Sequence, residues 1–145
     1  MEREEKKVSE KLTRARAVLA AQPFSVMLGA EITEYASDGV EIRLPINDDL
    51  KQQAGFVHGG VLSYLADNAL TFAGGGSLEG QVVTGEFKIN YIRPAVGSVL
   101  VARAKAISAG RTQAVTRCDI FVVKDGEERL CAAAQGTITV VRAVT

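Results

Sequence analysis

Charged residues alternate with apolar ones over residues 2–21, and the apolar positions recur three and four apart, as in an amphipathic helix. These apolar positions are Val8, Leu12, Ala15, Val18 and Leu19. The residue before a proline is pushed away from helical geometry, so Pro23 predicts where this helix stops. We expect this amphipathic helix to lie over the outside of the domain.

Strand-like alternation follows a short apolar plug at residues 24–28. Residues 30–35 and 40–46 are predicted strands, joined by the turn residues Ser37, Asp38 and Gly39. In the second strand the apolar residues Val40, Ile42, Leu44 and Ile46 alternate with Glu41, Arg43 and Pro45. This period of two predicts one buried and one wet face, so the two segments together are predicted to form a β-hairpin.

A second helical pattern starts directly after the sequence His58-Gly59-Gly60 and ends at the glycines of residues 74–76. Its apolar face consists of Val61, Leu62, Leu65, Ala69, Phe72 and Ala73. The opposite face is small and polar and consists of Gly60, Ser63, Tyr64, Asp67, Asn68, Thr71 and Gly74. One face of this helix is therefore predicted to be buried along its whole length.

From residue 82 onward the sequence is rich in Val, Ile and Thr and predicts strands at residues 82–93, 99–108, 112–124 and 129–142. The breaks between them are short enough for hairpins, which predicts an antiparallel meander. A meander after one long apolar helix indicates an α+β domain with the sheet curled round that helix. We expect a single domain over residues 1–145, with an N-terminal helix at 1–22 and a core at 24–142.

Composition narrows the class of protein. A chain of 145 residues that is 47% hydrophobic can build a full core. Its 17 basic and 17 acidic residues balance, which argues against a general affinity for nucleic acid or membranes. The charged start lacks the apolar region of a signal peptide, and no apolar run is long enough to span a bilayer, so we expect a cytoplasmic protein. Cys118 and Cys131 lie in apolar strand patterns and are predicted to be buried free thiols, and no metal site is expected.

The start of the central helix is the best candidate for chemistry. Gly59 and Gly60 follow the only histidine, His58, and the first turn of a helix has N–H groups without internal partners beside the positive end of the helix dipole. Such a place can hold a carbonyl oxygen as it gains negative charge. The only carboxylate of the helix, Asp67, lies nine residues beyond His58.

Helix geometry prevents these groups from sharing one pocket. Nine residues at ~1.5 Å rise and ~100° turn place His58 and Asp67 about 13 Å apart and roughly half a turn out of phase. Two copies of the helix that run antiparallel across a two-fold axis would instead bring Asp67 of one chain to His58 and Gly59 of the other. The sequence therefore suggests a homodimer with two composite sites.

A basic stretch follows, because no acidic residue lies between Glu86 and Asp119. Its six basic residues are Lys88, Arg93, Arg103, Lys105, Arg111 and Arg117. Arg93 and Arg111, next to Pro94 and Gly110 at strand ends, are the best placed to reach phosphates. The alternative is that these are solvated strand charges that balance acids elsewhere.

Residues 58–69, HGGVLSYLADNA, fit the pattern HGG-(six residues)-D-x-A, and NYIRPA follows at residues 90–95. In this combination, residues 24–142 resemble the hot-dog-fold acyl-CoA thioesterases of the phenylacetate-degradation (PaaI-like) type. The resemblance implies a helix wrapped by an antiparallel sheet, dimers with a continuous sheet that often pair into tetramers, and hydrolysis of aryl or medium-chain coenzyme A thioesters. Coenzyme A would enter as part of the substrate, with no other cofactor.

The resemblance also implies roles for single residues. The N–H of Gly59 would polarise the thioester carbonyl, and Asp67 of the other subunit would act as nucleophile or as base for water. The hydroxyl of Thr71 would hold water or the carboxylate, and Gln52 matches the polar residue six positions before the histidine. We expect His58 to orient or polarise through hydrogen bonding.

With coenzyme A as ligand, Arg93, Arg111 and Gly110 become the candidate contacts for its phosphates and pantetheine. Two other functions are compatible with this fold. One is a hydratase or dehydratase for acyl thioesters, although the HFP-type segment of those dehydratases is missing here. The other is an acyl-CoA-binding protein without catalytic activity.

Overall fold

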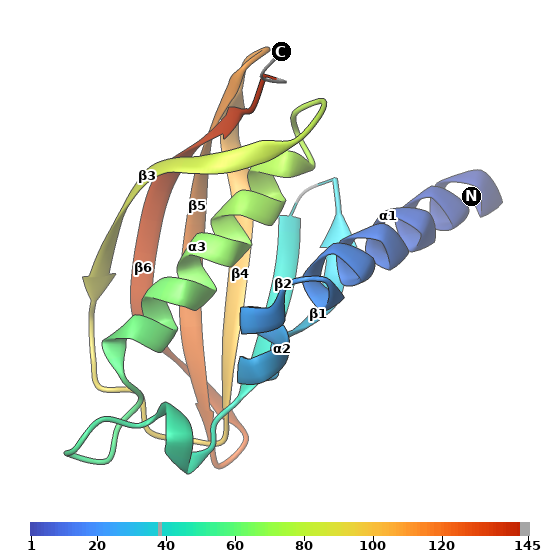
Figure 1. Ribbon diagram of the computed structural model, residues 1–145. Helices are drawn as coiled ribbons and strands as arrows, with labels where there is room; N and C mark the ends of the chain where they lie inside the picture. Colours follow the sequence, from blue (N-terminus) through green and yellow to red (C-terminus); the bar gives the residue numbers. More distant parts are fainter. Residues whose placement is uncertain (38, 143–145) are drawn as a thin grey trace.

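A computed structural model describes residues 1–37 and 39–142 of the chain. In Figure 1 the long helix α3 (Gly59–Gly75) lies across one face of a curved sheet, and two further helices lie beside the sheet at its β1 end. These are α1 (Glu2–Ala20) and α2 (Pro23–Leu28). The strands are β1 (Glu31–Ala36), β2 (Gly39–Pro45), β3 (Val82–Tyr91), β4 (Val99–Ala109), β5 (Gln113–Lys124) and β6 (Glu127–Val140), and a 3₁₀ turn, η1, covers Asp48–Leu50.

All strand pairs are antiparallel, and the order across the sheet is β1-β2-β4-β5-β6-β3. The predicted α+β hot-dog architecture is therefore confirmed, and so is the β1–β2 hairpin. Asp38, in the predicted turn of this hairpin, lies outside the described residues. An extended sheet face against one helix gives the core a single layer of side chains between them.

The prediction of a four-stranded meander is wrong in one respect. β3 does not pair with β4; it pairs with β6 from Val82↔Val140 to Tyr91↔Ala132, at the far edge of the sheet. The connection to β4 therefore crosses the end of the sheet, where the Ser98 N–H donates to the Val123 carbonyl at 2.8 Å. A break of hairpin length was compatible with both pairings, and the long-range contacts of β6 decided between them.

Most of the predicted apolar face of α3 is buried, with Leu62, Leu65 and Ala69 at most 3% exposed, while Val61 and Phe72 are half-buried. Gly74, predicted on the polar face, lies instead on the buried face. A Cβ built there would meet the side chain of Ile138 at 2.6 Å, so only glycine lets helix and sheet approach this closely. The fully buried Leu70 belongs to the same face.

The N-terminal segment covers one edge of the sheet. Ala15 and Leu19 of α1 are buried, whereas Val8 and Val18 of the predicted apolar face are exposed. Residues 24–28 are not a plug in the core but helix α2, which leaves most of its apolar side chains in solvent.

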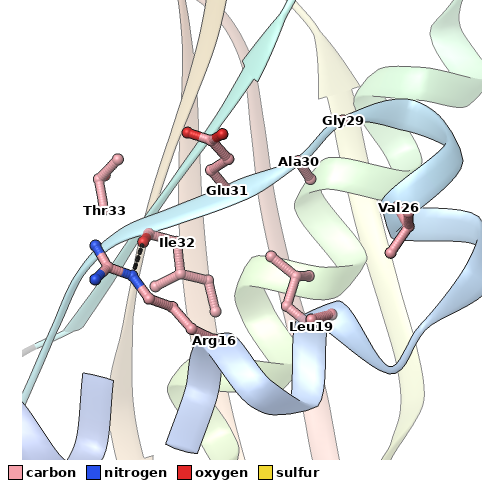
Figure 2. A pocket seen from close by; sticks show the side chains of 9 residues that line it. Arg16, Leu19, Val26, Gly29, Ala30, Glu31, Ile32 and Thr33 are labelled. Carbon is pink, nitrogen blue, oxygen red and sulfur yellow. Dashed lines mark hydrogen bonds between the residues drawn. The ribbon is translucent and has the colours of Figure 1, made fainter. Parts of the chain in front are cut away.

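Arg16 fixes α1 to the outer edge of β1. Its Nε donates to the carbonyl oxygen of Ile32 at 2.9 Å, as the dashed line in Figure 2 shows. A cleft of about 500 Å³ lies beside this bond, between α1, α2 and β1 (Figure 2). The β1 edge is thus partly paired, while no strand or helix pairs with the outer edge of β3 among the described residues.

The face of the sheet turned away from α3 carries a buried carboxylate where the sequence predicted a wet position. Glu41 is only 7% exposed and accepts hydrogen bonds from Thr33 at 2.7 Å and from the Nε atoms of Arg43 and Arg103 at 2.9 Å each. Arg103 also binds both oxygens of Glu128 at 2.7 Å. Burial by itself raises the pKa of Glu41, but its three hydrogen bonds outweigh burial and leave the pKa below its ordinary value.

Cys118 and Cys131 are buried free thiols, as predicted. Burial raises the pKa of both, that of Cys131 to about 11, so both stay protonated at neutral pH. Among the described helices, none has the length and apolar content that crossing a bilayer requires.

We predict that Glu41→Gln lowers the free energy of unfolding by about 1–2 kcal/mol at pH 7, because the variant loses charge-assisted hydrogen bonds to half-exposed arginines. A carboxylate with a lowered folded pKa stabilises above its unfolded pKa and loses this contribution as the pH falls through the folded value. The difference in free energy of unfolding between wild type and Glu41→Gln should therefore shrink below pH ~4. Urea denaturation at pH 7 and pH 3 measures it.

Glu127→Gln is the matched control for this measurement, since the Glu127 side chain is 75% exposed and only approaches Arg129 at 3.8 Å. It should change stability by less than about 0.5 kcal/mol at either pH. An equal loss of unfolding free energy in both variants would show that the buried hydrogen bonds of Glu41 contribute no more to stability than an exposed ion pair.

Candidate active site

The start of α3 leaves one backbone donor free. His58 is the N-cap residue, and its Nδ1 accepts from the Gly60 N–H at 2.8 Å while its carbonyl accepts from the Val61 N–H at 2.9 Å. No acceptor for the Gly59 N–H is found among the described residues. Since Nδ1 is an acceptor, the neutral imidazole carries its proton on Nε2. The Gly59 N–H is therefore the donor that a ligand can use.

A cavity of about 290 Å³ opens beside this donor. Its walls are Gln52, Phe56, Val57, Gly59, Leu62, Tyr91, Ile92, Arg93, Pro94 and Ala95. The Gln52 side-chain oxygen accepts from the Ala54 N–H, which ties this side chain to its own turn. No hydrogen bond from the Gln52 amide nitrogen is found in the described part of the chain, so this group remains available to a ligand in the cavity.

Asp67 belongs to a separate group of hydroxyls between α3 and β3. Thr84 donates to Asp67 Oδ1 at 2.5 Å, and Thr71 lies 2.8 Å from the Thr84 hydroxyl. Thr71 donates to the main-chain carbonyl of Asp67 at 2.7 Å, and no hydrogen bond from Thr71 to the carboxylate is found in the described part of the chain. The hydroxyl that holds the carboxylate is thus Thr84, next to a bulge in β3, and Thr71 supports it.

Thr84 was not predicted as a site residue, because its inward-facing position follows from the pairing of β3 with β6. Val82 and Thr84 both pair with residues of β6 that face α3, Val140 and Ile138, so a polar residue occupies an inward-facing position of a strand. A polar side chain on the core face needs a partner, and Asp67 provides it.

A second cavity, of about 560 Å³, lies next to Asp67 between α2, α3 and β3, with Phe24, Val83 and Thr84 in its walls. Its α2 side is held by a network of polar side chains. Tyr64 donates to the buried Ser25 hydroxyl at 2.5 Å, Ser25 donates to Gln22 at 2.6 Å, and Asn68 donates to Tyr64 at 3.0 Å. This network fixes the wall that α2 forms beside the carboxylate.

The two cavities share no lining residue, so Gly59 and Asp67 of one chain face different spaces. This separation agrees with the helix rise of ~1.5 Å per residue, which places Gly59 and Asp67 about 12 Å apart along the axis. His58 is likewise not brought to Asp67 within one subunit.

The candidate coenzyme A contacts lie at different ends of the sheet. Arg93 lines the cavity beside Gly59, directly after the end of β3. Gly110 and Arg111 form the β4–β5 turn, where the Gly110 N–H donates to the Gln113 carbonyl at 2.8 Å. Arg103 of the same basic stretch is occupied by Glu41 and Glu128. One subunit therefore does not bring Arg93 and Arg111 together.

The sequence is similar to that of known proteins. Residues 54–129 match the model of the family described as the thioesterase superfamily. A protein of Haemophilus influenzae provisionally named an esterase is 34% identical over 116 residues, which are 79% of this chain and 82% of the relative. The 1,4-dihydroxy-2-naphthoyl-CoA hydrolase of Listeria monocytogenes is 28% identical over 106 residues, 72% of this chain and 85% of that enzyme.

Solved structures agree. A thioesterase family protein from Silicibacter pomeroyi superimposes with a TM-score of 0.80 at 31% identity, over 89% of this chain and 96% of that one. The E. coli PaaI protein gives a TM-score of 0.80 at 21% identity over 93% and 96% of the two chains, a likeness of fold. The resemblance seen in the sequence is thereby confirmed, and the chain belongs to the thioesterase superfamily as a hot-dog-fold thioester hydrolase.

Proposed function

We propose that the protein hydrolyses acyl-CoA thioesters to a free acid and coenzyme A, in two composite sites of a homodimer. The observation that carries this proposal is the division of the site. The free Gly59 N–H and the carboxylate of Asp67, held by Thr84, lie in two separate cavities along α3 in the same subunit. Each is half of a hydrolytic site, and a second subunit supplies the missing half.

The bare edge of β3 is the surface that we assign to the dimer. β3 is ten residues long, and an unpaired edge of this length is a template for another strand. In an antiparallel pair across a two-fold axis, a residue on the axis lies opposite its own copy. An axis at Lys88, with Gly85 left unpaired in the β3 bulge, sets Thr84 opposite Tyr91 of the partner subunit. Because Thr84 contacts Asp67 and Tyr91 contacts Gly59, this register brings the two half-sites together.

In the composite site the carbonyl oxygen of the thioester accepts a hydrogen bond from the Gly59 N–H of one subunit. Charge that develops on this oxygen is stabilised by the free donor and by the positive end of the α3 dipole. Asp67 of the other subunit attacks the carbonyl carbon to form an anhydride that water then hydrolyses, or it removes a proton from a water molecule that attacks the carbon directly. The carbon–sulfur bond breaks, the coenzyme A sulfur leaves as a thiolate and is protonated, and water supplies the oxygen of the acid.

Two-fold symmetry also bears on the rest of the substrate. Antiparallel pairing brings opposite ends of the two sheets to the same side, so that Arg93 of one subunit and Gly110 and Arg111 of the other flank one site and bind the phosphates and pantetheine. Phe24 lines the cavity next to Asp67 and packs edge-to-face on Tyr64 with 5.2 Å between ring centroids. The aromatic side chains of Phe24 and Tyr64 suit an aryl or medium-chain acyl group. At the next level of assembly, the dimers pair into a tetramer.

The first test is Asp67→Asn, which keeps the shape of the side chain but removes the charge. We expect thiol release from aryl and medium-chain acyl-CoA esters to fall by about 10²–10⁴-fold in kcat, with KM nearly unchanged. Asp49→Asn, at an exposed aspartate in η1, is the control and should keep full activity. Full activity in Asp67→Asn would refute the assigned role.

Subunit mixing tests the composite site. Gly59→Pro removes the free N–H at the first helical position, where proline is tolerated best. The two variants to be mixed are Gly59→Pro and Asp67→Asn, and each should be nearly inactive alone. Refolding the two variants together at equal amounts should restore about a quarter of wild-type activity, because half of the dimers are mixed and each mixed dimer has one intact site. A mixture as inactive as its components would contradict sites shared between subunits.

Thr84→Val tests the hydroxyl that holds Asp67. We expect kcat to fall by about 5–50-fold, because the carboxylate loses the hydrogen bond that orients it. Thr137→Val is a matched control, since Thr137 donates to the carboxylate of Glu86 at 2.7 Å on the exposed face of the same strand pair. Steady-state thiol release is measured for both variants. Thr137→Val should keep the wild-type kcat, and an equal loss of kcat in both variants would contradict the assigned role of Thr84.

A further inference from the structure

One peptide group at the start of α3 is held at both of its ends. The Gly59–Gly60 peptide donates its N–H to His58 Nδ1, and its carbonyl oxygen accepts from the Tyr91 hydroxyl at 3.2 Å. In the preceding peptide the His58 carbonyl is bonded to the Val61 N–H. Of the hydrogen-bonding groups on these two peptides, only the Gly59 N–H is without a partner in the described part of the chain.

Tyr91 reaches this point from the end of β3. Two of its ring atoms lie 3.4 Å from where a Cβ of residue 59 would be, so the ring packs directly against the glycine. A phenol has a single hydrogen, and Tyr91 gives it to the Gly59 carbonyl, so Ser63 is the donor in its 2.6 Å contact with Tyr91. Tyr91 thus links the edge strand to the first two turns of α3.

We propose that Tyr91 is a positioning residue, which sets the direction of the Gly59 N–H through the Gly59 carbonyl. The inference rests on the proposed function, in which this N–H polarises the thioester. A backbone donor at the end of a helix is prone to fray, and a misplacement of about 1 Å costs up to 10²-fold in rate. Tyr91 and His58 bind opposite ends of the Gly59–Gly60 peptide. They thereby also fix the preceding His58–Gly59 peptide, which carries the Gly59 N–H.

Stability alone does not account for the Tyr91 hydroxyl. In the isolated subunit the side chain is 54% exposed, so this hydrogen bond contributes little to the folding of that subunit. Tyr35 provides the comparison, because its hydroxyl donates to the Phe72 carbonyl at the other end of α3 at 2.8 Å and is more deeply buried. The two tyrosines make the same bond to the same helix, and only Tyr91 makes it beside Gly59.

The test compares Tyr91→Phe with Tyr35→Phe. Tyr91→Phe keeps the ring and removes the bond, and we expect kcat to fall about 5–20-fold with KM within about twofold. The ¹H–¹⁵N resonance of Gly59 should move in this variant. In Tyr35→Phe we expect kcat within about twofold of wild type and an unmoved Gly59 resonance, even if Tm falls further than in Tyr91→Phe.

The proposal is overturned if Tyr91→Phe retains the wild-type kcat, if both variants lose kcat equally, or if the Gly59 resonance stays in place. These results are distinguishable from failure of the proposed function. In that case the wild-type protein would release no thiol from any acyl-CoA, or Asp67→Asn would remain active, and the Gly59 resonance alone would decide whether Tyr91 sets this peptide.

Discussion

The pitch of the α-helix is the constraint on which this structure depends. A helix that is buried along one face presents its N-terminus and its middle to different spaces, because the eight residues from Gly59 to Asp67 advance the helix by about 12 Å along its axis. The observed cavities follow this rule, one at the start of α3 and one beside Asp67. Each end of β3 meets one of them, through Tyr91 and Thr84. The edge strand is therefore part of the site as much as the helix is.

Patterns within one element could be predicted from the sequence, and contacts between elements mostly could not. The apolar face of α3 and the free donor after His58 follow from spacing and from the rules for helix ends. The position of β3 does not, because a short break fits a hairpin and a crossover equally well. Thr84 was missed for the same reason, since its partnership with Asp67 exists only once β3 lies beside α3.

The errors at Glu41 and Gly74 have the same origin. Alternation correctly placed Glu41 on the face away from α3, but side chains of its own strand and of both neighbouring strands donate hydrogen bonds to it and bury it there. Gly74 ends a polar stripe on a helical wheel, yet the side chain of Ile138 fills the space where a Cβ would be. In both cases a neighbour in space, rather than the sequence period, decided the environment.

The two edges of the sheet show how the fold separates stability from assembly. At β1 the carbonyl of Ile32 is satisfied by Arg16, and α1 lies against the strand. The β3 edge carries no such cover among the described residues, although its strand holds both threonine and tyrosine contacts to the reacting groups. A covered β3 edge would protect the single chain from association but would keep each half-site alone. In the scheme proposed above, leaving this edge open makes completion of the active site and pairing of the subunits the same event.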